Sequence, residues 1–377
     1  MKSIFQMIIA SLFTLKMIMA SLLFSSPIAM AEDTMNHDKQ TIRVPAFTLP
    51  VSSLMNQDVS EPAADNLSTE QLFSDIRTQC PPEDLTQAEL SKLPDIRRCR
   101  LNAFYKSTRY HSLIDRYPVL TQSQSIDGVV TDTVTPDGGV PAENQDKVLI
   151  NLHGGAFQIG SRYIGLMESI PIASLARIKV VTVDYRMAPE HHFPAASEDV
   201  ARVYRSLLKH YKPENIGIFG CSAGAMLTAQ SIAWFQQEKL PLPAAIAMQC
   251  AAASPRAGDS IYVVGAITGN DYSDMTWPYF EHADMANPMV LPALSAKVLS
   301  NFPPSLLVSS TRDDFLSSVI HTHRQLINVG VRAELHLWEG LGHGFLLDPS
   351  LPEAREVYKV TVDFFSTWLG RSGQQEP

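Results

Sequence analysis

The chain has 377 residues, 45% of them apolar and 18% charged, with a formal net charge of −9. This balance is typical of a globular protein with a sizeable core, and it excludes a disordered chain, a collagen and a coiled coil. The acidic charge and the lack of any run of Lys and Arg exclude a nucleic-acid partner, because phosphate binding requires a basic surface.

The first 31 residues have the pattern of a secretory signal peptide. They contain Lys2 and Lys16, no acidic residue, two apolar runs and a small-residue cleavage motif, Ala29-Met30-Ala31. The alternative is an uncleaved membrane anchor, but neither apolar run reaches the ~20 residues that a span needs. We therefore expect cleavage after Ala31, no stable membrane span in the mature chain, and a periplasmic or secreted protein.

The four cysteines divide into two pairs. Cys80 and Cys99 lie in a polar N-terminal region and are candidates for a disulfide, which an exported protein permits. Cys221 and Cys250 lie in apolar segments, where buried free thiols are expected. The chain has no C-x-x-C and no zinc-ligand spacing, so the sequence predicts neither a metal nor another cofactor.

Residues 32–125 form an N-terminal leader followed by a helical region. From Ser68 to about Tyr110 apolar residues recur at helical spacing, and Pro81-Pro82 divides this stretch into at least two helices.

From residue 126 onward, short β-rich runs alternate with helical patterns, as in a parallel sheet with helices on both faces. The stretch 254–300, rich in aromatic residues and prolines, interrupts the alternation and is interpreted as an insertion over the sheet within a single 126–377 domain. The predicted strands are Val129–Val134, Val148–Leu152, Val180–Val183, Ile216–Phe219, Ala244–Gln249, Leu306–Ser309 and Ala333–Leu337, and the predicted helices are 164–176, 195–211, 223–237, 317–329 and 352–369.

The motif Gly220-Cys221-Ser222-Ala223-Gly224 joins a predicted strand to a predicted helix. Such a turn holds its central residue on strained backbone and presents the serine hydroxyl above the sheet, at a helix N-terminus that favours developing negative charge. Ser222 is therefore the candidate nucleophile.

A second motif, His153-Gly154-Gly155-Ala156-Phe157, directly follows another predicted strand. Small residues there leave backbone N–H groups free to bind a substrate oxyanion, and each such donor contributes ~2.7–4 kcal/mol to lowering a barrier. Gly154, Gly155 and Ala156, together with Ala223, are the candidate oxyanion-hole residues, whereas His153 is expected to brace the loop rather than transfer protons.

The base and the acid are expected late in the chain, in the order serine, acid, histidine. His343 lies in a glycine-flanked loop after a predicted strand and is the candidate base. The remaining histidines considered lie in helices, in a strand or upstream of the nucleophile: His191, His192, His210, His321, His323 and His336. Asp313, at the end of the preceding strand, is the candidate acid, with Asp314 as the neighbouring alternative.

These motifs resemble those of the α/β-hydrolase fold and, within it, the carboxylesterases of the hormone-sensitive-lipase-like family. The resemblance rests on HGGAF, on the segment Asp184–Glu190 with Phe193–Ala196, on GCSAG and on HGF, and it covers roughly 145–370. Two residues depart from the family pattern: Ala156 replaces a third glycine, and Cys221 replaces the usual aspartate, which removes a charge beside the site.

The resemblance implies a mostly parallel sheet with helices on both faces and a helical cap formed partly by residues before about 120. The family's acid motif favours Asp313 and leaves Asp314 facing solvent or capping the helix that begins near Ser317. In the segment Asp184–Ala196, Arg186 and Glu190 are expected to hold a loop beneath the site.

The expected function is a cofactor-independent serine esterase that acts on small or short-chain acyl esters through an acyl-enzyme. Two alternatives stay open: an amidase or lactone hydrolase using the same triad, and a hydrolase-fold protein that binds a small ligand without turnover. The expected partner is a small-molecule ester, and the oligomeric state stays open, a homodimer included.

Overall fold

The computed structural model describes residues 52, 76, 78–80, 92–272 and 277–371. The predicted signal peptide and most of the helical pattern expected between Ser68 and residue 91 lie outside these residues. Within them, no helix combines the length and apolar character that crossing a membrane requires.

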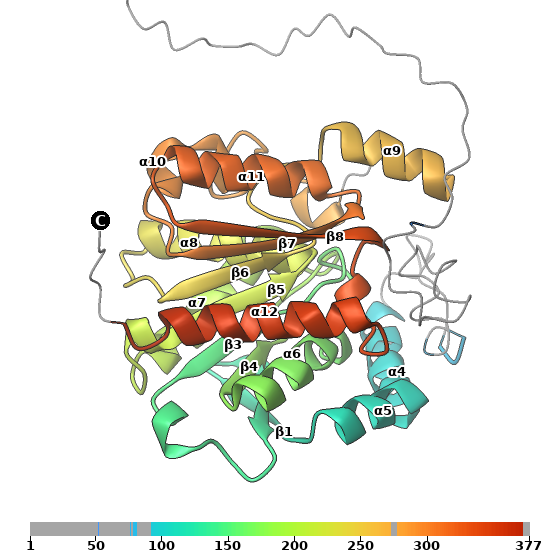
Figure 1. The fold of residues 1–377 in the computed structure, drawn as a ribbon, viewed down its shortest axis with the longest axis vertical. Helices are drawn as coiled ribbons and strands as arrows, with labels where there is room; N and C mark the ends of the chain where they lie inside the picture. Colours follow the sequence, from blue (N-terminus) through green and yellow to red (C-terminus); the bar gives the residue numbers. More distant parts are fainter. Residues whose placement is uncertain (1–51, 53–75, 77, 81–91, 273–276, 372–377) are drawn as a thin grey trace, which may run out of the picture. The chain divides into compact units, whose positions relative to one another are not determined.

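A single eight-stranded sheet forms the centre of the described chain (Figure 1). Its spatial order is β1-β2-β4-β3-β5-β6-β7-β8; β2 is antiparallel to both β1 and β4, and all other neighbours are parallel. The mostly parallel sheet expected from the alternating pattern is confirmed. The strands are β1 (Val119–Ile126), β2 (Val129–Pro136), β3 (Val148–Leu152), β4 (Lys179–Val183), β5 (Ile216–Cys221), β6 (Ala245–Gln249), β7 (Ser305–Arg312) and β8 (Ala333–Gly342).

The sheet begins earlier than the sequence predicted. Strand β1 starts at Val119 and pairs with β2 over its whole length, so the boundary at residue 126 cuts through a strand. The sequence Val-Leu-Thr-Gln-Ser-Gln-Ser-Ile is mostly exposed and polar because β1 is an edge strand, and it therefore lacks the apolar character of the buried strands.

Helices cover both faces of the sheet, and alternate strand residues face opposite sides. In β3, Ile150 packs in one core cluster with helices α7, α8 and α11, whereas Leu149 packs in the other with α6 and α12. The helices are α4 (Leu93–Lys106), α5 (Thr108–Arg116), α6 (Tyr163–Ala176), α7 (Ala195–Leu207), α8 (Ala223–Gln237), α9 (Asp259–Thr268), α10 (Ala296–Leu299), α11 (Leu316–Asn328) and α12 (Pro352–Trp368), with short 3-10 turns η3 (Ala142–Asn144), η4 (Pro213–Asn215), η5 (Pro278–Phe280), η6 (Pro292–Leu294) and η7 (Phe345–Leu347).

The insertion predicted between 254 and 300 contains α9, η5, η6 and α10, and its described residues, 254–272 and 277–300, add no strand to the sheet. In Figure 1, α9 and α4 lie at the end of the described chain toward which the parallel strands run, on the right of the view. The carboxyl ends of parallel strands are where α/β sheets build their ligand sites. The sequence motifs also lie at this end.

The candidate disulfide between Cys80 and Cys99 is present in the N-terminal region. Cys80 and Cys99 are bonded, with their Cα atoms 5.9 Å apart, which ties α4 to the chain before it. Cys221 and Cys250 are free and buried, as the apolar context of both predicted.

Candidate active site

Ser222 lies on a sharp turn between β5 and α8, in a strained backbone conformation with positive φ (φ 56°, ψ −121°) that only a constrained site holds. The glycines on either side, Gly220 and Gly224, leave no room for a side chain. A Cβ on Gly224 would lie 1.7 Å from the Leu152 carbonyl oxygen, and one on Gly220 would lie 2.2 Å from the same atom. Any side chain at either position would push the turn away from β3, so both glycines hold Ser222 close to the neighbouring strand.

Three side chains from separate strand ends form one line of hydrogen bonds. The Ser222 Oγ lies 2.8 Å from Nε2 of His343, and Nδ1 of His343 lies 2.8 Å from Oδ1 of Asp313. With Nδ1 protonated toward the carboxylate, Nε2 is left as the acceptor for the serine proton. The structure therefore brings together the three residues that the sequence singled out.

Asp313 is fully buried and its carboxylate has a partner on each oxygen. Oδ1 also accepts from the Phe315 amide at 3.0 Å, and Oδ2 accepts from the Ser309 hydroxyl at 2.9 Å. These bonds fix the carboxylate so that it, in turn, fixes the orientation of the imidazole of His343.

The sequence led us to expect that Asp314 faces solvent or caps the helix that begins near Ser317. It does neither, because α11 has no side-chain cap hydrogen bond and the Asp314 side chain is not exposed. It is buried, its Oδ2 accepts from Nε of Arg256 at 2.6 Å, and its Oδ1 lies 3.8 Å from Nδ1 of His343. The guanidinium of Arg256 also lies 4.5 Å from the centre of the Tyr272 ring. A buried carboxylate needs a charged partner, and this one comes from the insertion, 58 residues upstream in the sequence.

Two negative groups therefore surround the imidazole of His343. Burial lowers the pKa of His343, but the charge and hydrogen bond of Asp313, with the charge of Asp314, raise it by more. The net effect is a pKa above the ordinary 6.5 of histidine, which stabilises the imidazolium form.

The loop after β3 passes directly beside Ser222: a Cβ on Gly154 would lie 3.5 Å from the Ser222 Cβ. The amide of Gly154, however, donates to Oε1 of Glu168 at 2.9 Å, which corrects its assignment to the oxyanion hole. Within the described part of the chain, the amides of Gly155, Ala156 and Ala223 donate to no protein oxygen.

Glu168 was not identified from the sequence. It is buried on α6, accepts from Asn151 Nδ2 at 2.7 Å and from the Gly154 amide, and also contacts the backbone of Cys221. Burial raises the pKa of Glu168 to about 8, against the lowering effect of these hydrogen bonds. The signal was present: Glu168 is the one charged residue in the mostly apolar α6.

The expectation that Cys221 removes a charge beside the site is not overturned by Glu168. The thiol does remove the carboxylate usually found before the nucleophile, but α6 places another carboxyl group against the backbone of the same turn. Because the pKa of Glu168 is about 8, this carboxyl group is mostly protonated at neutral pH and supplies no negative charge there.

His153 holds the loop, as predicted. The ring is fully buried, its Nδ1 lies 2.7 Å from the Gly154 carbonyl, and it stacks on Tyr185 with ring centres 4.3 Å apart. The Tyr185 hydroxyl donates to the His153 carbonyl at 2.6 Å. Burial lowers the pKa of His153 to about 4, so the ring is neutral under ordinary conditions.

Charged residues hold the loops beneath the site. Arg186 donates to Asp199 at 3.0 Å, while Glu190 accepts from Nη1 of Arg97 at 2.8 Å. Arg97, on α4, also donates to the carbonyls of Gln158 and Ala188. The expected structural role of Arg186 and Glu190 is confirmed, and α4 is bound to the end of the oxyanion loop.

An aromatic cluster joins the insertion to this loop. Phe157 stacks on Tyr279 with ring centres 4.5 Å apart and contacts Trp277 at 5.8 Å, and Trp277 contacts Phe315 at 6.0 Å. The Phe315 ring lies 5.4 Å from the imidazole of His343. The insertion therefore borders the site with apolar rings.

Comparison with known proteins places this geometry in a family. A family model described as alpha/beta hydrolase fold matches residues 149–347, more than half of the chain. The chain belongs to the alpha/beta hydrolase family. The matched range contains all three residues of the hydrogen-bonded line and both glycine motifs, so the family resemblance inferred from the sequence is confirmed.

Curated relatives of the chain are named as hydrolases. It is 27% identical over 241 residues to an acetyl-hydrolase of Streptomyces hygroscopicus, an alignment covering 61% of this chain and 79% of that protein. It is 27% identical over 233 residues to an ethyl acetate hydrolase of Pseudomonas putida, covering 57% of this chain and 70% of the relative.

Among solved structures, that of esterase E25 is 28% identical in sequence and superposes with a TM-score of 0.72, covering 87% of this chain and 99% of the other. An esterase of the bacterial hormone-sensitive lipase family, 24% identical, superposes with a TM-score of 0.67 over 83% of this chain and all of its own. The second likeness is one of fold.

Proposed function

We propose that this protein is a serine carboxylic-ester hydrolase. The observation that carries the proposal is the hydrogen-bonded line Ser222–His343–Asp313 at a strained turn, beside a loop with unoccupied amide donors. A hydroxyl in contact with an imidazole that is itself held by a buried carboxylate is the arrangement that activates a serine nucleophile.

In this mechanism the Ser222 Oγ attacks the ester carbonyl and His343 Nε2 takes the serine proton. The amides of Gly155, Ala156 and Ala223 bind the oxyanion of the tetrahedral intermediate, and Asp313 stabilises the imidazolium. His343 then protonates the leaving alcohol, and a water molecule activated by the same imidazole releases the acid from the acyl-enzyme.

Two observations support small or short-chain acyl esters as the substrates. Relatives of the chain are named as an acetyl-hydrolase and an ethyl acetate hydrolase. Bulky rings also border the triad, because Phe315 lies against His343 and Trp277 lies against Phe315. Both favour a short acyl chain.

A panel of chromogenic esters of increasing acyl length tests the proposal, with matched amides and lactones in parallel. We expect turnover of the acetyl and butyryl esters, with kcat/KM falling for long chains. Faster turnover of the amides or lactones would assign the triad to the alternative reaction. Binding without turnover of any member would identify a ligand-binding protein and overturn the enzymatic proposal.

We propose further that the protein is exported to the periplasm or secreted. The signal-peptide pattern of residues 1–31 supports this, as does the Cys80–Cys99 disulfide, because such bonds persist in oxidising compartments. Cell fractionation with N-terminal sequencing of the mature protein tests it. We expect the exported fraction to contain a chain that starts at Glu32, directly after the cleavage site at Ala31. A chain with an intact N-terminus in the cytosol would contradict the proposal.

A further inference from the structure

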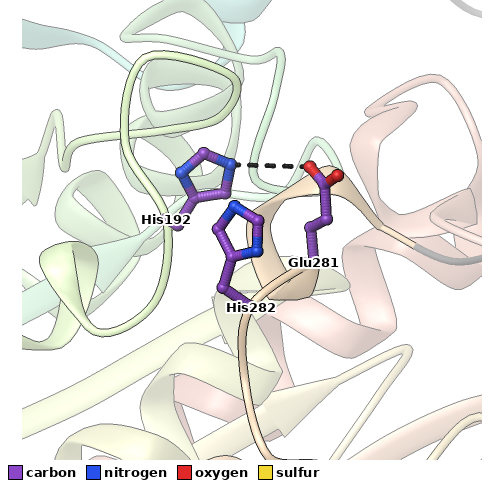
Figure 2. A group of neighbouring side chains, drawn as sticks. All are labelled: His192, Glu281 and His282. Carbon is purple, nitrogen blue, oxygen red and sulfur yellow. Dashed lines mark ion pairs between the residues drawn. The ribbon is translucent and has the colours of Figure 1, made fainter.

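Two segments far apart in the sequence bring three metal-ligating side chains together outside the triad. His192 follows the cis peptide of Ala188-Pro189, and Glu281 and His282 follow η5 in the insertion. Figure 2 shows the ring of His192 and the ring of His282 turned toward each other and toward the Glu281 carboxylate.

The distances suit a metal ion. A ligand atom from each residue lies within 4.8 Å of the other two, and His192 Nε2 lies 3.8 Å from Glu281 Oε2. Tetrahedral Zn²⁺ with bonds of ~2.0–2.1 Å separates its ligand atoms by about 3.3 Å. Binding would shorten the His192–Glu281 separation by about 0.5 Å and any separation as long as 4.8 Å by about 1.5 Å. Side-chain rotations can supply these shifts, because Glu281 and His282 are exposed and His192 is only partly buried.

The backbone that carries these side chains is already fixed. The Phe193 amide, next to His192, donates to the carbonyl of Tyr279 at 2.9 Å, two residues before Glu281. The Tyr279 hydroxyl accepts from the Ala196 amide at 2.8 Å. The two segments are thus held in register by hydrogen bonds that do not involve the three ligands, which lowers the entropy cost of binding an ion.

We propose that His192, Glu281 and His282 form a Zn²⁺ site on the surface of the protein. Two imidazoles and one carboxylate are a ligand set that zinc takes in proteins, with a water molecule in the fourth position. The sequence did not predict this site, because His192 is separated from the other two ligands by 89 and 90 positions and no short spacing motif links them.

The metal ion would link the loop that carries His192, between β4 and α7, to the insertion that carries Glu281 and His282. Phe193 lies beside Phe280, so the residues next to the ligands already pack together. An ion that binds the folded chain and not the unfolded one stabilises the fold by mass action. Zinc should therefore raise the Tm of the protein without taking part in ester hydrolysis.

Isothermal titration of the metal-free protein with Zn²⁺, together with Co²⁺ absorption spectroscopy, tests the site. We expect one equivalent bound, a tetrahedral Co²⁺ spectrum, and a Tm that rises by about 2 °C or more at saturation. His192→Ala, His282→Ala and Glu281→Gln should each weaken binding by about tenfold or more and reduce the Tm shift.

His336→Ala is the matched control. His336 Nε2 lies 3.6 Å from Glu334 Oε2, an exposed pair much like His192–Glu281, but in the described chain no third ligand completes it. This variant should bind Zn²⁺ like the wild type. Undetectable binding by the wild type, or binding that His192→Ala and His282→Ala leave intact, would overturn the proposal. Binding lost only in His343→Ala would place the ion at the triad and overturn it as well.

Discussion

His343 Nε2 lies 2.8 Å from the Ser222 Oγ, although the two residues are 121 positions apart and follow different strands. Because the hydroxyl is presented above the sheet and is not needed for packing, Ser222→Ala should abolish ester hydrolysis while the protein stays folded. Loss of the nucleophile costs about 10⁶ in kcat in a serine protease. The measurement is kcat on a chromogenic acetyl ester, with circular dichroism as the control, and more than about one per cent of wild-type activity would point to another nucleophile.

The two adjacent aspartates should differ in their effect. Asp313→Asn disturbs the imidazole tautomer and should lower kcat by about 10⁴, as in serine proteases. Asp314→Asn keeps the Asp313–His343 bond and should lower kcat only a few-fold, although it leaves Arg256 without its carboxylate. Both variants are compared at equal folded concentration, and the reverse ranking would make Asp314 the catalytic acid.

The same pair predicts the pH dependence of activity. His343 must be neutral to accept the serine proton, and the charges of Asp313 and Asp314 raise its pKa above 6.5. Activity should therefore still be rising between about pH 7 and pH 9. In Asp314→Asn one of the raising charges is gone, so the acid limb should move to lower pH. A limb that stays in place, or moves upward, would show that Asp314 does not act on His343.

Much of this site could be predicted from the sequence, because its motifs directly follow predicted strands. The turn at Ser222 and the loop at Gly155 both follow apolar strands, and parallel strands end at one edge of the sheet, so their residues must meet. The sequence could not place Asp314, since its partner Arg256 comes from an insertion whose path no periodicity describes. Strand β1 was not predicted because it is mostly exposed and polar, so its sequence shows no alternation of apolar and polar residues.

Ala156 has a left-handed backbone conformation (φ 53°), which costs a residue with a Cβ about 1–2 kcal/mol relative to one without. Ala156→Gly restores the glycine usual in the family motif and keeps the amide in the proposed oxyanion hole. We expect unchanged kcat and a free energy of unfolding that is equal or higher by up to about 1 kcal/mol, since glycine also gains entropy in the unfolded chain. Denaturant unfolding and steady-state kinetics check this, and a kcat loss beyond tenfold would mean that the methyl group itself positions the loop.

Glu168 should position the oxyanion loop through the Gly154 amide. In Glu168→Ala that buried amide loses its acceptor, and the loop carrying the Gly155 and Ala156 donors is released. Displacing such groups by about 1 Å can cost about 10² in rate. We therefore expect kcat to fall by about 10- to 100-fold, with little change in KM. Glu168→Gln, which keeps one acceptor oxygen, should recover part of the loss.

Stability separates this role from simple packing. The pKa of Glu168 is about 8 in the folded protein, against the ordinary value of 4.5 that applies to the unfolded chain. Between these two values the folded chain therefore holds a proton that the unfolded chain has released. Stability should fall as pH rises through this window, by up to about 1.4 kcal/mol per pH unit, and Glu168→Gln should remove that slope. Asp132→Asn, at another buried carboxylate that pairs with Arg162 on the same α6 side of the sheet, is the control. If Asp132→Asn lowers kcat as much as Glu168→Ala, the loss reflects general destabilisation and Glu168 has no specific role in the loop.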